Sequence, residues 1–209
     1  MLAIGLSVLL ANFMMSDSFE NHSFCPDYRP QRTLDVDQLM GIWYAIEIFE
    51  HDREGVPTTL RSCPTVHLGR ESRSDLRLVW SESAFTFYYH IRLNDPASPG
   101  FWLSSGPYNG TTVEDDYSTR FSGTIQVMKA VGNHVVLTFC KSEHNSKVFS
   151  VLLSRERWLS KLEIRGVINM LQRRGLESKS IKHACSGVAG LFRNFFVHVV
   201  LASIFIYLL

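Results

Sequence analysis

The stretch Leu39–Ile46 constrains the fold of this chain more than any other. Its residues alternate as in a strand, and Gly41 stands two positions before Trp43. A glycine takes backbone conformations closed to other residues or lets another segment pass close by. Trp43 adds a large apolar side chain whose one N–H needs a partner when it is buried. The simplest interpretation is a first strand that carries a buried tryptophan.

A residue far along the chain extends this interpretation. Arg155 follows the strand-like run that starts at Val151 and directly precedes a helical pattern. An arginine over an indole face contributes about 0.5–2 kcal/mol and can also donate to nearby carbonyls. We therefore expect Gly41, Trp43 and Arg155 to close one end of a curled sheet.

Between these landmarks the chain carries eight short apolar or alternating runs separated by turn residues. The clearest is Phe85–Leu93, in which Phe85, Phe87 and Tyr89 share one side. Runs this close in sequence predict an antiparallel meander, either a sandwich or a closed barrel. The expected strands are Gly41–Phe49, Thr65–Leu68, Leu76–Trp80, Phe85–Leu93, Gly100–Ser104, Phe121–Val127, Val135–Cys140 and Val148–Leu153.

One helix follows the last of these strands. Ser160 and Glu163 fit a capping box, with Leu159 and Ile164 placed to form the hydrophobic staple. An apolar stripe at helical spacing predicts a helix that lies on a sheet, and Gly175 can end it. The stripe consists of Ile164, Val167, Ile168 and Leu171, and a last short strand is expected at Ser178–Lys182.

Both ends of the chain carry targeting patterns. Residues 1–18 contain a short apolar run followed by polar residues, which predicts a signal peptide, with a buried N-terminal helix as the alternative. Residues 187–209 hold a spacer and an apolar tail behind small residues, the layout of a glycolipid attachment signal with Ser186 as acceptor. A short retained membrane helix is the competing interpretation. Asn21 and Asn109 are glycosylation acceptors if the chain is secreted.

Composition narrows the class of protein. The chain has 209 residues, 45% of them hydrophobic, and a net charge of +1, so nothing suggests a nucleic-acid partner. We expect no metal and no cofactor. Its four cysteines include no Cys-x-x-Cys pair, which favours disulfides over a zinc site in a secreted chain. The sequence alone leaves three pairings open.

Together these features resemble the lipocalin family over about Cys25 to Cys185, and most of all its apolipoprotein D and Lazarillo branch. Gly41-x-Trp43 is similar to that branch's first motif, and Arg155 stands at the arginine of the third motif. The second motif, Thr-Asp-Tyr, reads Lys129-Ala130-Val131 here, so contacts at the closed end are expected to differ.

The resemblance implies an all-β fold over residues 19–186: an eight-stranded antiparallel up-and-down barrel with one helix packed outside. The positions of the cysteines in the family imply the bridges Cys25–Cys140 and Cys63–Cys185. An apolar cup is implied as well, with the aromatic side chains as its expected lining. These side chains are Trp80, Phe85, Phe87, Tyr89 and Phe121, and plain core packing is their alternative role.

Such a protein is expected to bind and transport a small hydrophobic ligand, such as a lipid, fatty acid, retinoid or pigment, outside the cell or at the outer membrane leaflet. An enzyme is the first rival, because one lipocalin branch makes prostaglandins with a cup thiol, but the implied bridges claim every cysteine. Haem binding through a histidine is the second rival. We expect His67, His90 and His134 instead to be ordinary surface histidines. The last rival is a cell-surface recognition module that meets a receptor and uses the barrel as a scaffold.

Overall fold

The computed structural model describes residues 25–52, 62–83, 85–93, 95–105, 121–140 and 148–185. The expected signal peptide, the glycosylation acceptors Asn21 and Asn109, the anchor site Ser186 and the apolar tail all lie outside these residues. Within the described ranges, no helix is long and apolar enough to cross a membrane.

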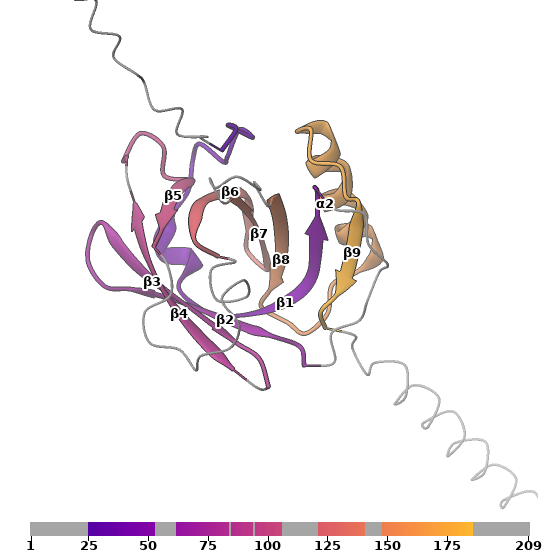
Figure 1. Ribbon diagram of the computed structural model, residues 1–209, viewed down its shortest axis with the longest axis horizontal. Helices are drawn as coiled ribbons and strands as arrows, with labels where there is room; N and C mark the ends of the chain where they lie inside the picture. The colour runs from indigo at the N-terminus through magenta and orange to yellow at the C-terminus, as the bar shows by residue number, and fades with distance from the viewer. Residues whose placement is uncertain are drawn as a thin grey trace, which may run out of the picture.

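The described strands form one antiparallel sheet that curls on itself (Figure 1). Each strand from β2 to β8 pairs with the next along the chain, and β1 then pairs with both β8 and β2. This closure confirms the expected eight-stranded barrel. The strands are β1 (Gly41–Glu50), β2 (Thr65–Arg70), β3 (Asp75–Ser81), β4 (Thr86–Leu93), β5 (Phe101–Ser104), β6 (Gly123–Val131), β7 (His134–Cys140), β8 (Val148–Ser154) and β9 (Ser180–His183).

Strand β1 closes the barrel by dividing one of its edges between two partners. Its first half, Gly41–Tyr44, pairs with β2, and its second half, Glu47–Glu50, pairs with β9. The other edge pairs with β8. Strand β9 therefore covers the edge that β1 exposes after it has parted from β2, so that backbone donors there find partners.

A bulge in β1 decides which side chains enter the barrel. The register against β8 shifts between Ala45 and Glu47. Ala45 and Ile48 lie in the interior cluster, whereas Ile46 and Phe49 pack outside. Strict alternation from Trp43 would have turned Glu47 into the apolar interior, and the bulge prevents this.

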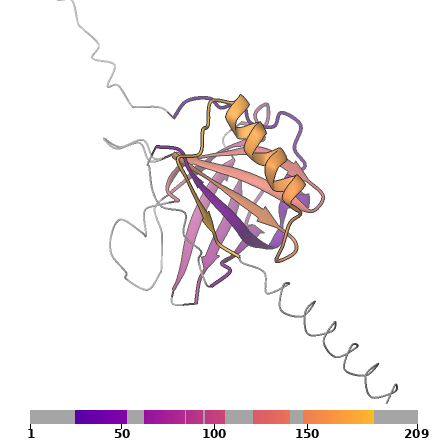
Figure 2. The ribbon, with the colours of Figure 1, turned by 90° about the vertical axis from the view of Figure 1, so that its right-hand side faces the viewer.

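The helix α2 (Lys161–Arg173) covers one outer wall of the barrel (Figure 2). It begins at the expected capping box, in which the Ser160 side chain accepts from the Glu163 N–H and the Glu163 carboxylate accepts from the Ser160 N–H. Val167 and Leu171 are its buried residues, and they pack on the outer faces of β1, β6, β7 and β8. The sheet thus has two apolar layers, one inside the barrel and one beneath the helix.

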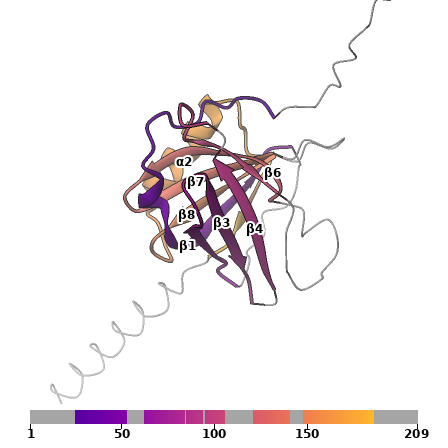
Figure 3. The same ribbon diagram turned by 90° about the vertical axis from the view of Figure 1, so that its left-hand side faces the viewer.

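Residues 25–34 form an N-terminal strap over the outside of β6. The Gln126 side chain, which is 1% exposed, accepts from the Tyr28 N–H and donates to the Pro26 carbonyl. Gln31 binds twice, through its N–H to the Val127 carbonyl and through its side chain to the Ala130 N–H. The strap ends in the short 3₁₀ helix η1 (Val36–Leu39), which leads into β1. Figure 3 shows the opposite wall, β3 and β4, with no described helix over it.

The element boundaries correct the expectations in a few places. Phe85 precedes β4, and Phe121 lies in a turn before β6, so neither belongs to a strand. The last strand begins at Ser180 and ends at His183, two residues after the expected start and one after the expected end. Strands β1, β2, β3 and β8 also extend beyond the residues that alternation marked.

Candidate functional site

The closed end of the barrel is built around Trp43 and Arg155. The Arg155 guanidinium carbon lies 3.6 Å from the centroid of the Trp43 ring, which is 1% exposed. Partial burial lowers the pKa of Arg155 from its ordinary value. The indole N–H of Trp43 donates to the Leu39 carbonyl at 2.8 Å, which satisfies the one polar atom of this buried side chain.

The same guanidinium also binds the backbone that leads into β1. Nη1 donates to the Ile42 carbonyl at 3.0 Å, and Nη2 donates to the carbonyls of Gln38 and Met40 at 2.9 Å each. Gly41, the first residue of β1, lies between these carbonyls with φ +103°. A Cβ on Gly41 would stand 3.2 Å from Arg155 Nη1. The conformation and the closeness of the arginine both favour glycine here.

Aromatic rings fill the middle of the barrel. Phe121 is at the centre, with ring centroids 4.6 Å from Trp80, 5.5 Å from Tyr89, 5.1 Å from Phe139 and 5.5 Å from Phe149. The last two rings stack on each other at 5.0 Å. Phe121 is 1% exposed although it comes from a turn outside the strands.

The other expected lining residues lie in or beside the same cluster. Phe87 and Tyr89 are buried on β4, with centroids 6.5 Å apart, and Phe85 packs 4.9 Å from Phe87 at the strand's beginning. Buried side chains of β7 and β8, which the sequence did not single out as lining, complete it. These are Leu137, Phe139, Phe149, Val151 and Leu153.

One void among the described residues lies inside the barrel. Seven apolar side chains line it, and it has no room for a water-sized molecule. Pockets for small ligands usually measure about 300–1,000 Å³. Because Phe121 reaches in from its turn and touches four rings, it occupies the centre of the chamber. The seven residues are Val66, Leu78, Trp80, Leu137, Phe139, Val151 and Leu153.

Comparison with known proteins places the fold. No family model and no curated protein matches the sequence. Solved structures do match: lobster apocrustacyanin A1 has 10% identity and a TM-score of 0.52 over 74% of this chain and 81% of the other. The siderocalin Ex-FABP has 10% identity and a TM-score of 0.50 over 73% of this chain and 97% of the other. The chain has the lipocalin fold.

This chain has Lys129-Ala130-Val131 where the lipocalin second motif has Thr-Asp-Tyr, and other contacts hold this part of the closed end. The Ala130 N–H donates to the Gln31 side chain of the strap. In the neighbouring turn, Asn133 accepts from the Arg155 N–H through its carbonyl and donates from its side chain to Glu163. The closed end is therefore joined to both the strap and the helix without the motif's aspartate.

All four cysteines lie in disulfides, Cys25–Cys140 and Cys63–Cys185, the pairing that the resemblance implied. The first joins the strap to the end of β7, and the second joins the chain before β2 to the residue two positions after β9. No cysteine thiol is left for thiolate chemistry of the kind that the enzyme alternative required.

Two histidines, His183 and His51, take part in polar contacts that sequence reasoning did not find. His183 of β9 lies 2.7 Å from the carboxylate of Glu47, which is 6% exposed. Burial raises the pKa of Glu47, and the hydrogen bond from His183 opposes this. His51 contacts Ser150 at 2.8 Å, and burial lowers the pKa of its imidazole. The only sign of the Glu47–His183 pair in the sequence was Glu47 itself, a charged residue inside the apolar run of β1.

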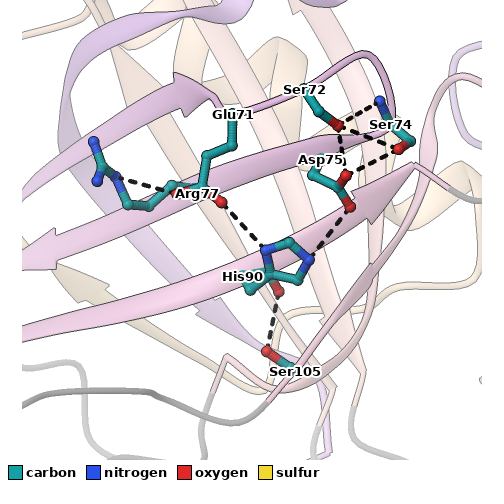
Figure 4. A network of polar contacts seen from close by, with 7 residues as sticks. All are labelled: Glu71, Ser72, Ser74, Asp75, Arg77, His90 and Ser105. Atoms are coloured by element: carbon teal, nitrogen blue, oxygen red, sulfur yellow. Dashed lines mark hydrogen bonds and ion pairs between the residues drawn. The ribbon is translucent and has the colours of Figure 1, made fainter.

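His90 lies on the outside of β4, between the carboxylates of Glu71 and Asp75, each 3.3 Å from one ring nitrogen (Figure 4). This cluster ties the β2–β3 turn to β4. His134 corrects the expectation of a surface histidine, because it is 4% exposed, while His67 is exposed as expected. Among the described residues, no group of histidine, cysteine and carboxylate side chains could hold a metal ion.

Proposed function

We propose that this chain is an extracellular lipocalin that binds and carries one small hydrophobic ligand inside its barrel. The observation that carries this proposal is the aromatic interior of a closed lipocalin barrel. Burial of apolar ligand surface against these rings supplies the affinity, at roughly 25 cal/mol per Å². A lipid, fatty acid, retinoid or pigment fits this chemistry. The siderocalin Ex-FABP, which has the same fold, is described as functioning through dual ligand specificities.

A ligand that enters the aromatic interior must part its packed rings, and Phe121 is the side chain placed to allow it. Its backbone lies in a turn before β6, outside the sheet ladder, while its ring packs against Trp80. A backbone outside the sheet ladder moves at lower cost than a strand, because fewer hydrogen bonds hold it. Phe121 then acts as a plug whose displacement lowers the apparent affinity for ligand.

Titration of the purified protein with a fluorescent fatty acid and with retinol tests the proposal. We expect saturable binding, and tighter binding by Phe121→Ala, because that substitution removes the cost of opening. Tyr88→Ala is the matched control, since Tyr88 is 36% exposed on the outer face of β4 and its loss should leave binding unchanged. Circular dichroism verifies that each variant is folded. Absence of binding by both the native protein and Phe121→Ala, in both ligand classes, contradicts the proposal.

We further propose membership of the apolipoprotein D and Lazarillo branch and a glycolipid anchor on Ser186 in place of the apolar tail. The two disulfides and the Gly41-x-Trp43 motif support the branch. The tail is apolar from Phe195 onward, and a soluble carrier would expose it to water. Phosphatidylinositol-specific phospholipase C on intact cells should release the protein. Retention, while a known glycolipid-anchored control is released, favours a membrane helix.

One observation favours a second function, recognition of a receptor by the outer surface. A surface groove of about 610 Å³ lies between the strap and the β4–β5 connection. Arg29, Arg32, Asp27 and Asp95 are among its lining residues. Under this alternative, Arg29→Ala with Arg32→Ala abolishes cell binding, and Phe121→Ala leaves it intact.

A further inference from the structure

We propose that the closed end of the barrel, not its mouth, rests on the outer leaflet of the membrane. The contact surface, here named the basal patch, consists of Ile42, Trp158 and Leu162. This inference rests on the proposed anchor and adds to it the orientation of the protein and the side from which ligand arrives.

The basal patch is exposed and apolar. Ile42 is 58% exposed, Trp158 58% and Leu162 79%. Ile42 lies at the start of β1, where its carbonyl accepts from Arg155. Trp158 lies between β8 and α2, and Leu162 lies in the first turn of α2. All four tryptophans of the chain are in the described ranges, and the other three are at most 1% exposed. An exposed tryptophan together with exposed aliphatic side chains at one end of the barrel is the composition of an interfacial membrane contact.

Charges around the patch suit a lipid headgroup layer. Arg157 lies 5.1 Å over the Tyr44 ring, beside Trp158. Arg157 and Lys161 are both exposed, while Glu156 is the exposed carboxylate of the same connection. Long basic side chains can reach phosphate groups while their stems stay near apolar surface.

The course of the chain directs the anchor toward this end, from a last described residue, Cys185, that lies opposite Ile46, midway along β1. Strand β1 starts at the closed end, and β9 runs antiparallel to it, so β9 heads back toward the closed end. The N–H groups of Ala184 and Cys185 both donate to the Ile46 carbonyl, and Cys185 is held to Cys63 by a disulfide. Figures 1 and 2 show the end of β9 near the connection between β8 and α2.

The distance available to the tether is short. Ser186, the proposed attachment residue, directly follows Cys185, so a lipid there starts at the barrel wall. If the tail is retained instead, Phe195 is ten residues beyond Cys185, and ten extended residues span at most about 36 Å. Either anchor keeps the domain near the bilayer, and the basal patch then turns the closed end toward it. The mouth then opens away from the membrane, and ligand enters from the extracellular side.

Tryptophan quenching tests this orientation. The full chain, purified in detergent from a secretory expression host, is reconstituted into phosphatidylcholine vesicles that carry a nitroxide on the acyl chain. We expect the lipid-borne nitroxide to quench the emission of the exposed tryptophan, and Trp158→Phe to remove the quenched component. In the Trp158→Phe background, Tyr88→Trp places a reporter on the uncovered β4 wall, and this reporter should remain unquenched by lipid while staying open to aqueous iodide.

Each outcome separates the orientation from the anchor. Flotation with the vesicles and quenching of Trp158 alone support the proposal. Flotation without quenching of Trp158, or with stronger quenching of the Tyr88→Trp reporter, overturns the orientation and leaves the anchor standing. Failure to float overturns the anchor, and the orientation falls with it.

Discussion

The contact between Arg155 and Trp43 holds the end of β8 against the start of β1, the last and first strands of the barrel. The guanidinium lies 3.6 Å over the indole ring, and its donors reach three carbonyls in the segment that leads into β1. Arg155 follows the end of β8 directly, so one side chain fixes β8, η1 and β1 together. A lysine lacks the planar fork that donates to these carbonyls while it lies flat on the indole ring.

Replacing Trp43 tests the core of this arrangement. Trp43→Ala removes a ring that is 1% exposed, and we expect a loss of about 3–5 kcal/mol in the free energy of unfolding. Trp158→Ala is the control, because its side chain is largely exposed and should change stability by only about 0.5 kcal/mol. Urea denaturation followed by circular dichroism measures both. Equal midpoints for Trp43→Ala and the native protein would show that the ring is not buried.

The backbone at Gly41 supplies a second test. Gly41→Ala puts a Cβ 3.2 Å from Arg155 Nη1 at φ +103°, and strain of this kind costs on the order of 1–3 kcal/mol. The turn residue Gly132 is the matched control, since a Cβ there meets nothing within 4 Å. Gly132→Ala should be neutral or slightly stabilising. Thermal melting of the pair checks this, and similar melting temperatures would contradict it.

Each disulfide closes a long segment of the chain, and we expect this to stabilise the domain. Cys63→Ser with Cys185→Ser opens a connection of 122 residues, and we expect a loss of about 2–4 kcal/mol. The mechanism is constraint of the unfolded chain, so the native fold should remain. Denaturant midpoints measure the loss. Peptide mapping without reduction verifies the pairing, and a peptide that joins Cys25 to Cys63 would refute it.

Glu163 should make the stability of the helix start depend on pH. Hydrogen bonds from Asn133 and Ser160 lower its pKa from 4.5 to about 2. Ionised Glu163 therefore stabilises the folded state above about pH 4.5, and this contribution is lost as the pH falls toward about 2. Glu163→Gln should lower the melting temperature at neutral pH and have little effect near pH 2. Glu156→Gln controls for net charge, and a difference independent of pH would exclude the capping carboxylate as its cause.

Much of the fold was predictable because local rules act on it directly. The alternation in β4 predicted a strand with Phe87 and Tyr89 on one side, and the pattern Ser160 to Glu163 predicted the start of the helix. Gly41 and Trp43 marked the closed end, since a glycine can take a positive φ and a tryptophan is a large apolar side chain that tends to be buried.

Other parts depend on contacts between residues far apart in sequence. The strap is held by Gln126, about 100 positions from Pro26, and an isolated glutamine in a strand gives no sign of such a role. The Glu47–His183 pair needs a bulge and a ninth strand to form. The size of the interior depends on where Phe121 points, and alternation cannot assign a direction to a residue outside a strand.

The divided edge of β1 also orders events while the chain is being made. Strand β1 leaves the ribosome early, but most of its partners lie in β8 and β9, at residues 148–154 and 180–183. The barrel therefore closes only after nearly the whole described domain has been synthesised. During that interval Cys25 and Cys63 are present together while Cys140 and Cys185 do not yet exist. A bridge between the first two cysteines is thus the earliest error open to a nascent chain in an oxidising compartment, and its repair depends on thiol–disulfide exchange.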